Sequence, residues 1–355
     1  MWQYYVTMGV VGAGGAATQA VIAVLVGARY GTAVAGLVLG AGVFGRFAAA
    51  MLERRGAAPQ VLTRLYVMMV GSLALIVTAA AAPWWAAAVM SALAGVFPVL
   101  LMSALMHRNH GSIPGGSSAS MLAQTAAFFV TGVAARAGDW ALVAVAVAIT
   151  GALVLLRGVV AGVPASPVAM QVDAGEGRQT DDEPVVAAPG ALVWTMFPLL
   201  LGVVAYGPLS LFATLVTVEL GADWVGPGFL SYALGSLLAG RVLAARRFGL
   251  GGVAVLAAMG GAVWFVALLS WGTLLVTRFV AGVVMFVAQG AMLQRASEHS
   301  RASLASALVG VGVGTQLGAV WCGLVAESSI TAMAAVSVVA SLTLAAATRW
   351  TIGRA

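Results

Sequence analysis

The chain has 355 residues, of which 62% are hydrophobic and only 8% are charged. Soluble domains carry about 25% charged residues, so this composition cannot cover a water-facing surface. The formal net charge of +6 comes from 17 basic residues, all arginines, that lie between apolar stretches instead of gathering on one aqueous face. Composition therefore excludes a soluble protein and argues against nucleic-acid binding.

Apolar runs bounded by charged residues, Gly or Pro recur along the whole chain. A helix needs about 20 apolar residues to cross a bilayer, so runs of this length indicate transmembrane helices. In chain order they are 4–27, 32–52, 62–82, 84–106, 117–135, 140–161, 192–217, 226–245, 250–270, 272–293, 303–325 and 329–348. The sequence predicts an all-α, polytopic membrane protein with about twelve transmembrane helices.

Residues 164–190 separate the first six runs from the last six. This segment contains four prolines and five of the eleven acids, so it cannot form a packed core. We predict two pseudo-symmetric six-helix bundles, 1–163 and 191–355, that are joined by a cytoplasmic, acidic, Pro-rich linker.

Arginine placement predicts the orientation of the chain in the cell inner membrane. With the N-terminus inside, most arginines fall at cytoplasmic ends and loops, whereas Arg29 and Arg136 fall outside. Several acids, Glu219 and Glu327 among them, then fall at outer ends. Both termini are predicted to be cytoplasmic.

The two halves of the sequence resemble each other. Gly40-x4-Gly45-Arg46 near the end of the second run matches Gly235-x4-Gly240-Arg241 near the end of the eighth. Residues 93–108 also align without a gap with residues 280–295. A parallel repeat of this kind is typical of transporters built from two halves.

At the loop after the second run, Ala49-x3-Glu53-Arg54-Arg55-Gly56 resembles a motif of the major facilitator superfamily. The resemblance covers the whole chain and implies a transporter with two rocking bundles. It also implies a cytoplasmic latch in which Glu53 faces the region of Arg301; a plain basic loop is the alternative. The Gly-Pro signature of many drug exporters is missing from the fifth run, and the Arg-x3-Gly pattern occurs as Arg278-x3-Gly282 on the tenth run.

Intramembrane ionisable residues are costly, so Arg278 is the leading candidate for solute contact. Gln289 lies eleven residues later, three helical turns along nearly the same face, and Gly282 and Met285 share that face. These side chains could hold an anionic or carbonyl-bearing solute. The alternatives are that Arg278 snorkels to the outer surface or pairs with Glu219 or Glu327 as a structural tie.

Other polar residues inside predicted spans have the same two interpretations, solute contact or an interhelical hydrogen bond. The further candidates for solute binding are Gln19, Gln124 and Gln316. Tyr206, before Gly207-Pro208, marks a candidate break in the seventh helix. The predicted gate and latch residues are Glu53, Arg54, Arg55, Arg301, Arg46, Arg241, Tyr206 and Glu219.

We therefore expect a secondary transporter that moves a small organic solute by alternating access, with export slightly favoured. Uptake or facilitated diffusion of an anionic metabolite is the alternative, and a non-transport membrane enzyme or assembly protein is an alternative of another class. No constellation of His, Cys and acids suits catalysis or metal binding, so we expect no enzyme, catalytic residue, metal or cofactor. The expected partners are the solute and the lipid bilayer, with a coupling ion left open and no nucleic acid, and the expected state is a monomer.

Overall fold

The computed structural model describes residues 2–54, 60–96, 101, 113–157, 193–245, 249, 252–253, 255–256, 259–260, 271–299 and 301–352. Within these ranges every regular element is a helix, which confirms the predicted all-α class. The predicted linker 164–190 and most of the predicted span 250–270 lie outside the described residues.

The helices before the linker form a first group. Its elements are α1 (Trp2–Val21), the π-helix η1 (Ile22–Val26), α2 (Gly27–Arg54), α3 (Val61–Ala81), α4 (Trp84–Ala94), α6 (Ile113–Arg136), α7 (Asp139–Gly151) and the 3-10 helix η3 (Ala152–Leu156). The elements α1, η1 and α2 follow one another directly along the chain, but the backbone leaves the helical conformation at Gly31, where two helices meet at a kink. Gly31 has φ 86°, a conformation that costs little only for glycine.

The helices after the linker form a second group. Its elements are α10 (Val193–Leu201), the π-helix η4 (Gly202–Tyr206), α11 (Gly207–Ser210), α12 (Phe212–Leu220), η5 (Ala222–Trp224), α13 (Val225–Ala245), η6 (Trp271–Thr273), α15 (Leu274–His299), α16 (Arg301–Ser328) and α17 (Ile330–Ile352). The predicted seventh span is thus a row of four segments, α10, η4, α11 and α12, instead of one regular helix. Pro198 lies inside α10 and Pro208 inside α11.

Apolar length supports the membrane assignment. Five described stretches are long and apolar enough to cross a membrane: Trp2–Leu52, Leu62–Ala81, Asp139–Leu156, Leu274–Ala296 and Ser306–Ser328. The first of them has 51 residues and contains two predicted spans, because it includes the turn at Gly31. Each predicted span other than 250–270 coincides at least in part with described helices.

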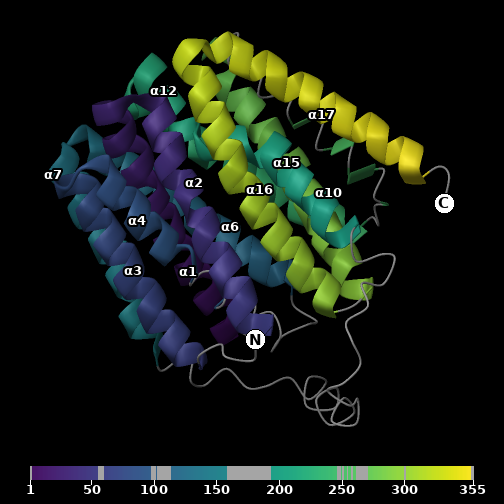
Figure 1. Cartoon of the computed structure of the whole chain (residues 1–355), viewed down its shortest axis with the longest axis horizontal. Helices are drawn as coiled ribbons and strands as arrows, with labels where there is room; N and C mark the ends of the chain where they lie inside the picture. The colour runs from purple at the N-terminus through teal and green to yellow at the C-terminus, as the bar shows by residue number, and fades with distance from the viewer. Residues whose placement is uncertain are drawn as a thin grey trace.

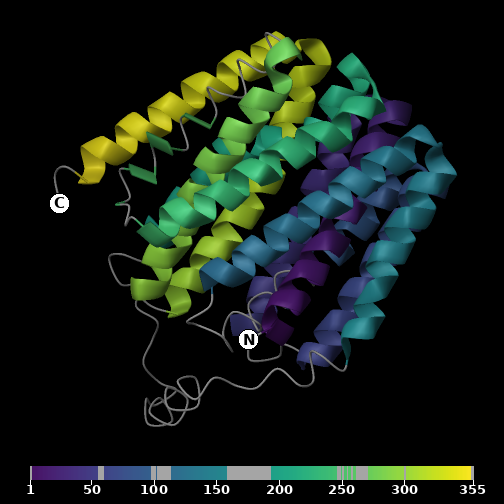
Figure 2. The same ribbon diagram turned by 180° about the vertical axis from the view of Figure 1, so that it is seen from behind.

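The two groups lie side by side, the first in purple and blue and the second in teal, green and yellow (Figures 1 and 2). Across their boundary α2 packs against α16, and α6 packs against α13. One apolar core runs through both groups; it includes Leu25 and Phe128 from the first and Phe212 and Cys322 from the second.

Candidate functional site

A cavity of about 220 Å³ lies between the two groups, and we call it the Arg278 chamber. It is lined by Gln19, Ala23, Gln124, Thr125, Phe128, Leu209, Ser210, Ala213, Phe229, Tyr232, Arg278, Gln289 and Thr315. The helices α1, α6, α13, α15 and α16 all contribute to this lining, so no single group of helices builds the chamber.

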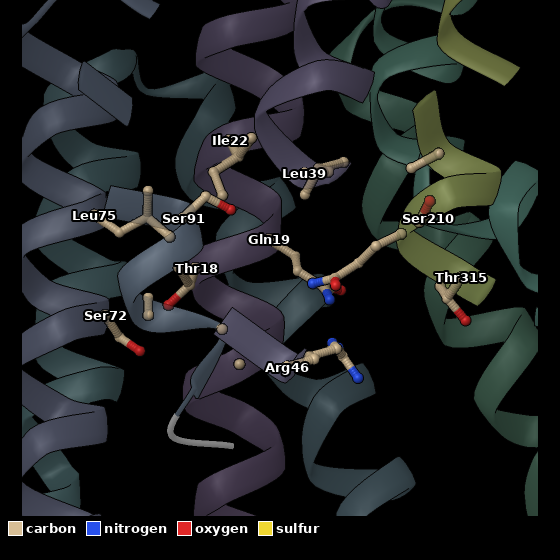
Figure 3. A pocket seen from close by; sticks show the side chains of 15 residues that line it. Thr18, Gln19, Ile22, Leu39, Arg46, Ser72, Leu75, Ser91, Ser210 and Thr315 are labelled. Atoms are coloured by element: carbon tan, nitrogen blue, oxygen red, sulfur yellow. The ribbon is translucent and has the colours of Figure 1, made fainter. Parts of the chain in front are cut away.

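A second cavity of about 110 Å³ adjoins the first, and we call it the Arg46 chamber. Its lining residues are Gly15, Thr18, Gln19, Ile22, Leu39, Arg46, Ser72, Leu75, Ser91, Ala94, Gly95, Ser210, Thr315, Gln316 and Ala319 (Figure 3). Gln19, Ser210 and Thr315 line both chambers. The two chambers are therefore two parts of one central site.

Arg278 is 1% exposed and is surrounded by aromatic rings. Its guanidinium carbon lies 3.9 Å from the ring centre of Phe212, 4.7 Å from that of Tyr232 and 5.8 Å from that of Phe229. A cation over the face of an aromatic ring is attracted by the negative charge density of that face. The burial contradicts the alternative in which Arg278 snorkels to the surface.

The rings beside Arg278 also connect the two groups of helices. Phe128 of α6 stacks on Phe229 of α13, with ring centres 3.8 Å apart and planes 4° apart. Phe229 in turn meets Phe212 edge-to-face at 5.0 Å. Ring pairs of this kind add to the free energy of apolar burial. The Arg278 chamber is thus held in shape by contacts across the group boundary.

All five residues predicted to bind solute line the central site. Gln19, Gln124, Gln289 and Arg278 line the Arg278 chamber, while Gln316 lines the Arg46 chamber. The amide Nε2 of Gln124 donates to Ser120 Oγ at 3.1 Å. The other members of the predicted helical face do not line the site: Met285 is 2% exposed inside an apolar cluster, and Gly282 packs against the backbone of Tyr232. A binding role for the five remains a prediction.

The sequence missed a cavity role for Arg46, which it assigned to a cytoplasmic gate. The structure places this side chain in the Arg46 chamber instead of at a helix end. One signal was available, because Arg46 lies six residues inside the predicted span 32–52. The matching Arg241 on α13 is exposed and lines neither chamber.

The other predicted gate residues lie in three settings. Glu53 and Arg54 end α2 and Arg301 begins α16, but their side chains, and all of Arg55, lie outside the described residues. The predicted latch therefore stays a prediction. Tyr206 ends the π-helix η4, with its side chain outside the described residues, and Glu219 is exposed near the end of α12.

The two groups also touch at the end of the bundle that carries the turn at Gly31, which we call the far end. Glu327 of α16 accepts a hydrogen bond from Thr32 Oγ1 at 2.7 Å and another from the Ala33 backbone N–H at 3.1 Å. Its carboxylate thus caps the part of α2 that follows Gly31, where a negative charge is favourable. Nothing in the sequence pattern pairs Glu327 with residues nearly 300 positions away.

Two further contacts cross the boundary at the far end. Arg136 at the end of α6 forms an ion pair with Asp223 of η5, and the hydrogen bond from Arg136 lowers the pKa of the Asp223 carboxyl. Thr214 Oγ1 of α12 donates to the Ala23 carbonyl in the π-helix η1 at 3.0 Å. The far end is therefore closed by polar contacts between the two groups.

No protein-family model and no curated protein matches this sequence. Solved structures do resemble it. A mutant of the nucleoside transporter NupG superposes with a TM-score of 0.70 at 14% identity, covering 98% of each chain. A D-xylose-proton symporter gives 0.69 at 14% identity, covering 97% of each chain. The xylose transporter XylE from E. coli, in a partially occluded inward-open conformation, gives 0.70 at 12% identity, covering 99% of this chain and 97% of its own.

Proposed function

We propose that this chain, which has the fold of the major facilitator superfamily, is a secondary transporter. It moves a small polar organic solute across the cytoplasmic membrane by alternating access. The observation that carries the proposal is the central site, whose lining comes from helices on both sides of the group boundary. A solute bound there touches both halves, so rocking of one half against the other changes the side from which the solute is reached.

The lining of the site favours a polar solute. Four glutamines supply amide donors and acceptors, and Ser210 and Thr315 supply hydroxyl groups between the two chambers. The similar structures named above include a nucleoside transporter and a D-xylose-proton symporter. Polar solutes of similar size suit this lining, and a proton is one candidate for a coupling ion. None of these names describes an exporter, so they give no support to export as the favoured direction.

The contacts at the far end supply the gate that the proposal requires. The Glu327 cap, the Arg136–Asp223 pair and the Thr214–Ala23 hydrogen bond all join the two groups there. Each must break when that end opens. The π-helices η1 and η4 lie in the helices that separate, and π-turns are frequent at functional sites.

The test is solute flux in vesicles that contain the purified protein. Flux of labelled D-xylose, a labelled nucleoside and labelled glycerate is measured in both directions, with empty vesicles as the control. We expect protein-dependent, saturable flux of at least one solute. No flux of any solute above the control would favour the enzyme or assembly-protein alternative.

A cross-link across the group boundary tests alternating access itself. Cys322 is the chain's one cysteine and is buried, so Cys322→Ala gives a background for the pair Arg136→Cys and Asp223→Cys. A disulfide between these positions should stop flux, and a reductant should restore it. Unchanged flux in the cross-linked protein would contradict a mechanism that opens the far end.

A further inference from the structure

The helices α2 and α16 cross the group boundary as an antiparallel pair with glycines at their contacts. A Cβ added to Gly36 would lie 2.5 Å from the Ala319 carbonyl oxygen, and one added to Gly323 would lie 2.7 Å from the Thr32 carbonyl oxygen. Distances this short leave no room for a side chain. The two backbones therefore approach closely, as glycine-lined helix pairs do in membranes.

Nearer the Arg46 chamber, each helix of the same pair packs one long polar side chain against a glycine of the other helix. A Cβ on Gly312 of α16 would lie 1.7 Å from Arg46 Nη1, and a Cβ on Gly42 of α2 would lie 2.2 Å from Gln316 Nε2. Arg46 of α2 therefore packs on Gly312 of α16, and Gln316 of α16 packs on Gly42 of α2. On each helix, the glycine and the long side chain are four residues apart. This reciprocal contact fixes both polar groups beside the chamber, and Figure 3 shows Arg46 and Gln19 extending into the same space.

The electrostatics of the Arg46 chamber are unbalanced. Arg46 Nε and Gln316 Oε1 are buried atoms that have no hydrogen-bond partner among the described residues. Among the residues that the structure describes, no acid lines either chamber. Burying a charge is costly unless an opposite charge or hydrogen-bond acceptor compensates for it. An anion in the chamber would supply that compensation.

Arg46 and Arg278 differ in what surrounds them. Aromatic rings already lie against Arg278 at 3.9 and 4.7 Å, so much of its guanidinium face is covered. Arg46 instead borders polar side chains, with Gln19, Thr315 and Gln316 in the lining of its chamber. A guanidinium edge that faces a cavity can bind a carboxylate or phosphate through two parallel hydrogen bonds. The polar lining of its chamber therefore favours Arg46 as the anion site.

We infer that the solute is a small organic oxyanion with a neighbouring hydroxyl group, whose carboxylate or phosphate binds Arg46 while its hydroxyl donates to Gln316 Oε1. The Arg46 chamber, at about 110 Å³, has room for such a group, since about 10–15 Å³ of this kind of space holds one water. The rest of the solute extends past Gln19 into the Arg278 chamber. This inference rests on the proposed transport function.

The first test is binding to the purified full-length chain, measured by calorimetry at constant ionic strength. Three probes of one skeleton are compared: glycerate, glycerol 3-phosphate and glycerol. At least one anion should bind about tenfold or more tightly than glycerol, because hydrogen bonds to charged groups are the stronger ones. The preferred anion distinguishes a carboxylate site from a phosphate site. Equal or undetectable binding of all three would overturn the inference.

The second test assigns the binding to Arg46. Arg46→Gln should weaken binding of the anion about tenfold or more and leave binding of glycerol unchanged. The anion affinity of Arg46→Lys should lie between those of the wild type and Arg46→Gln. The control is Arg241→Gln, which removes the same charge from the repeat-equivalent position outside both chambers. Equal anion affinity in Arg46→Gln and Arg241→Gln would overturn the assignment.

Wild-type protein gives a measurement that does not depend on how the variants fold. Phenylglyoxal modifies arginines, and the modified positions are read by mass spectrometry. The anion should reduce modification of Arg46 and leave modification of Arg241 unchanged. Equal modification of Arg46 with and without the anion would contradict an anion site at Arg46. In vesicles, saturable flux of a neutral solute together with no flux of either anion would refute this inference alone, whereas absence of all flux would refute the proposed transport function.

Discussion

The Glu327 cap allows a quantitative prediction about the far end. Glu327→Ala removes the acceptor for two hydrogen bonds, from Thr32 Oγ1 and from the Ala33 N–H. The carboxylate is exposed, so solvent screens it, and loss of a cap of this kind costs about 1 kcal/mol. Because about 1.4 kcal/mol is a factor of ten, the ratio of far-end-open to far-end-closed molecules should rise about fivefold. Glu327→Gln keeps an acceptor and should have a smaller effect.

The assay uses a single reporter cysteine in the central site. In the Cys322→Ala background, Ser210→Cys places a thiol at the boundary of the two chambers. A membrane-impermeant maleimide added on the side of the far end should label this thiol about fivefold faster after Glu327→Ala, if closing limits access. Glu219→Ala is the matched control, since it removes an exposed carboxylate from the end of α12. Equal labelling rates in Glu327→Ala, Glu219→Ala and the parent would refute the reasoning.

Three further predictions concern other contacts. Tyr232→Leu should lower the free energy of unfolding by about 0.5–2 kcal/mol more than Tyr232→Phe, because only Phe keeps a ring face toward Arg278. Chemical denaturation in micelles measures this difference, and equal free energies of unfolding would contradict the prediction. Gly312→Ala should weaken anion binding about tenfold or more by displacing Arg46, as calorimetry can show, and unchanged binding would mean that this glycine does not position the guanidinium. The Arg136–Asp223 pair is formed above the unfolded carboxyl pKa of about 3.9 and is lost only as the pH falls through the lowered pKa of Asp223. Maleimide reacts with the thiolate, so the parent and Asp223→Asn are compared at the same pH. The ratio of their far-end labelling rates should stay constant between about pH 6 and 8, and a ratio that changes across this range would refute this prediction.

Sequence reasoning found the helices and five polar residues of the lining for a physical reason. Apolar length identifies a membrane span directly, and polar residues inside such spans are rare enough to be noticed. Gln19, Gln289 and Arg278 stand out on this basis, and all three line the central site. The turn at Gly31 also falls in the gap between the predicted spans 4–27 and 32–52.

The remaining features depend on contacts between residues far apart in the chain. The rings around Arg278 come from α12 and α13, and Phe128 of α6 stacks on one of them. The Glu327 cap joins residues 295 positions apart. Arg46 was assigned to a helix end because charge pattern gives the side of the membrane but not the depth of a side chain. Its depth follows from the register of α2 against α16, which no local pattern contains.

That register connects the two ends of the proposed mechanism. The Glu327 cap on Thr32, the glycine contacts at Gly36 and the packing of Arg46 against Gly312 all lie along the same α2–α16 pair. Glycine contacts this close leave little freedom to slide, so opening of the far end must separate or tilt the two helices along much of their length. Such a movement changes the surroundings of Arg46 together with those of Glu327. An anion that binds Arg46 more tightly in one arrangement therefore shifts the gate toward that arrangement, and by linkage the gate changes the affinity for the anion by the same factor.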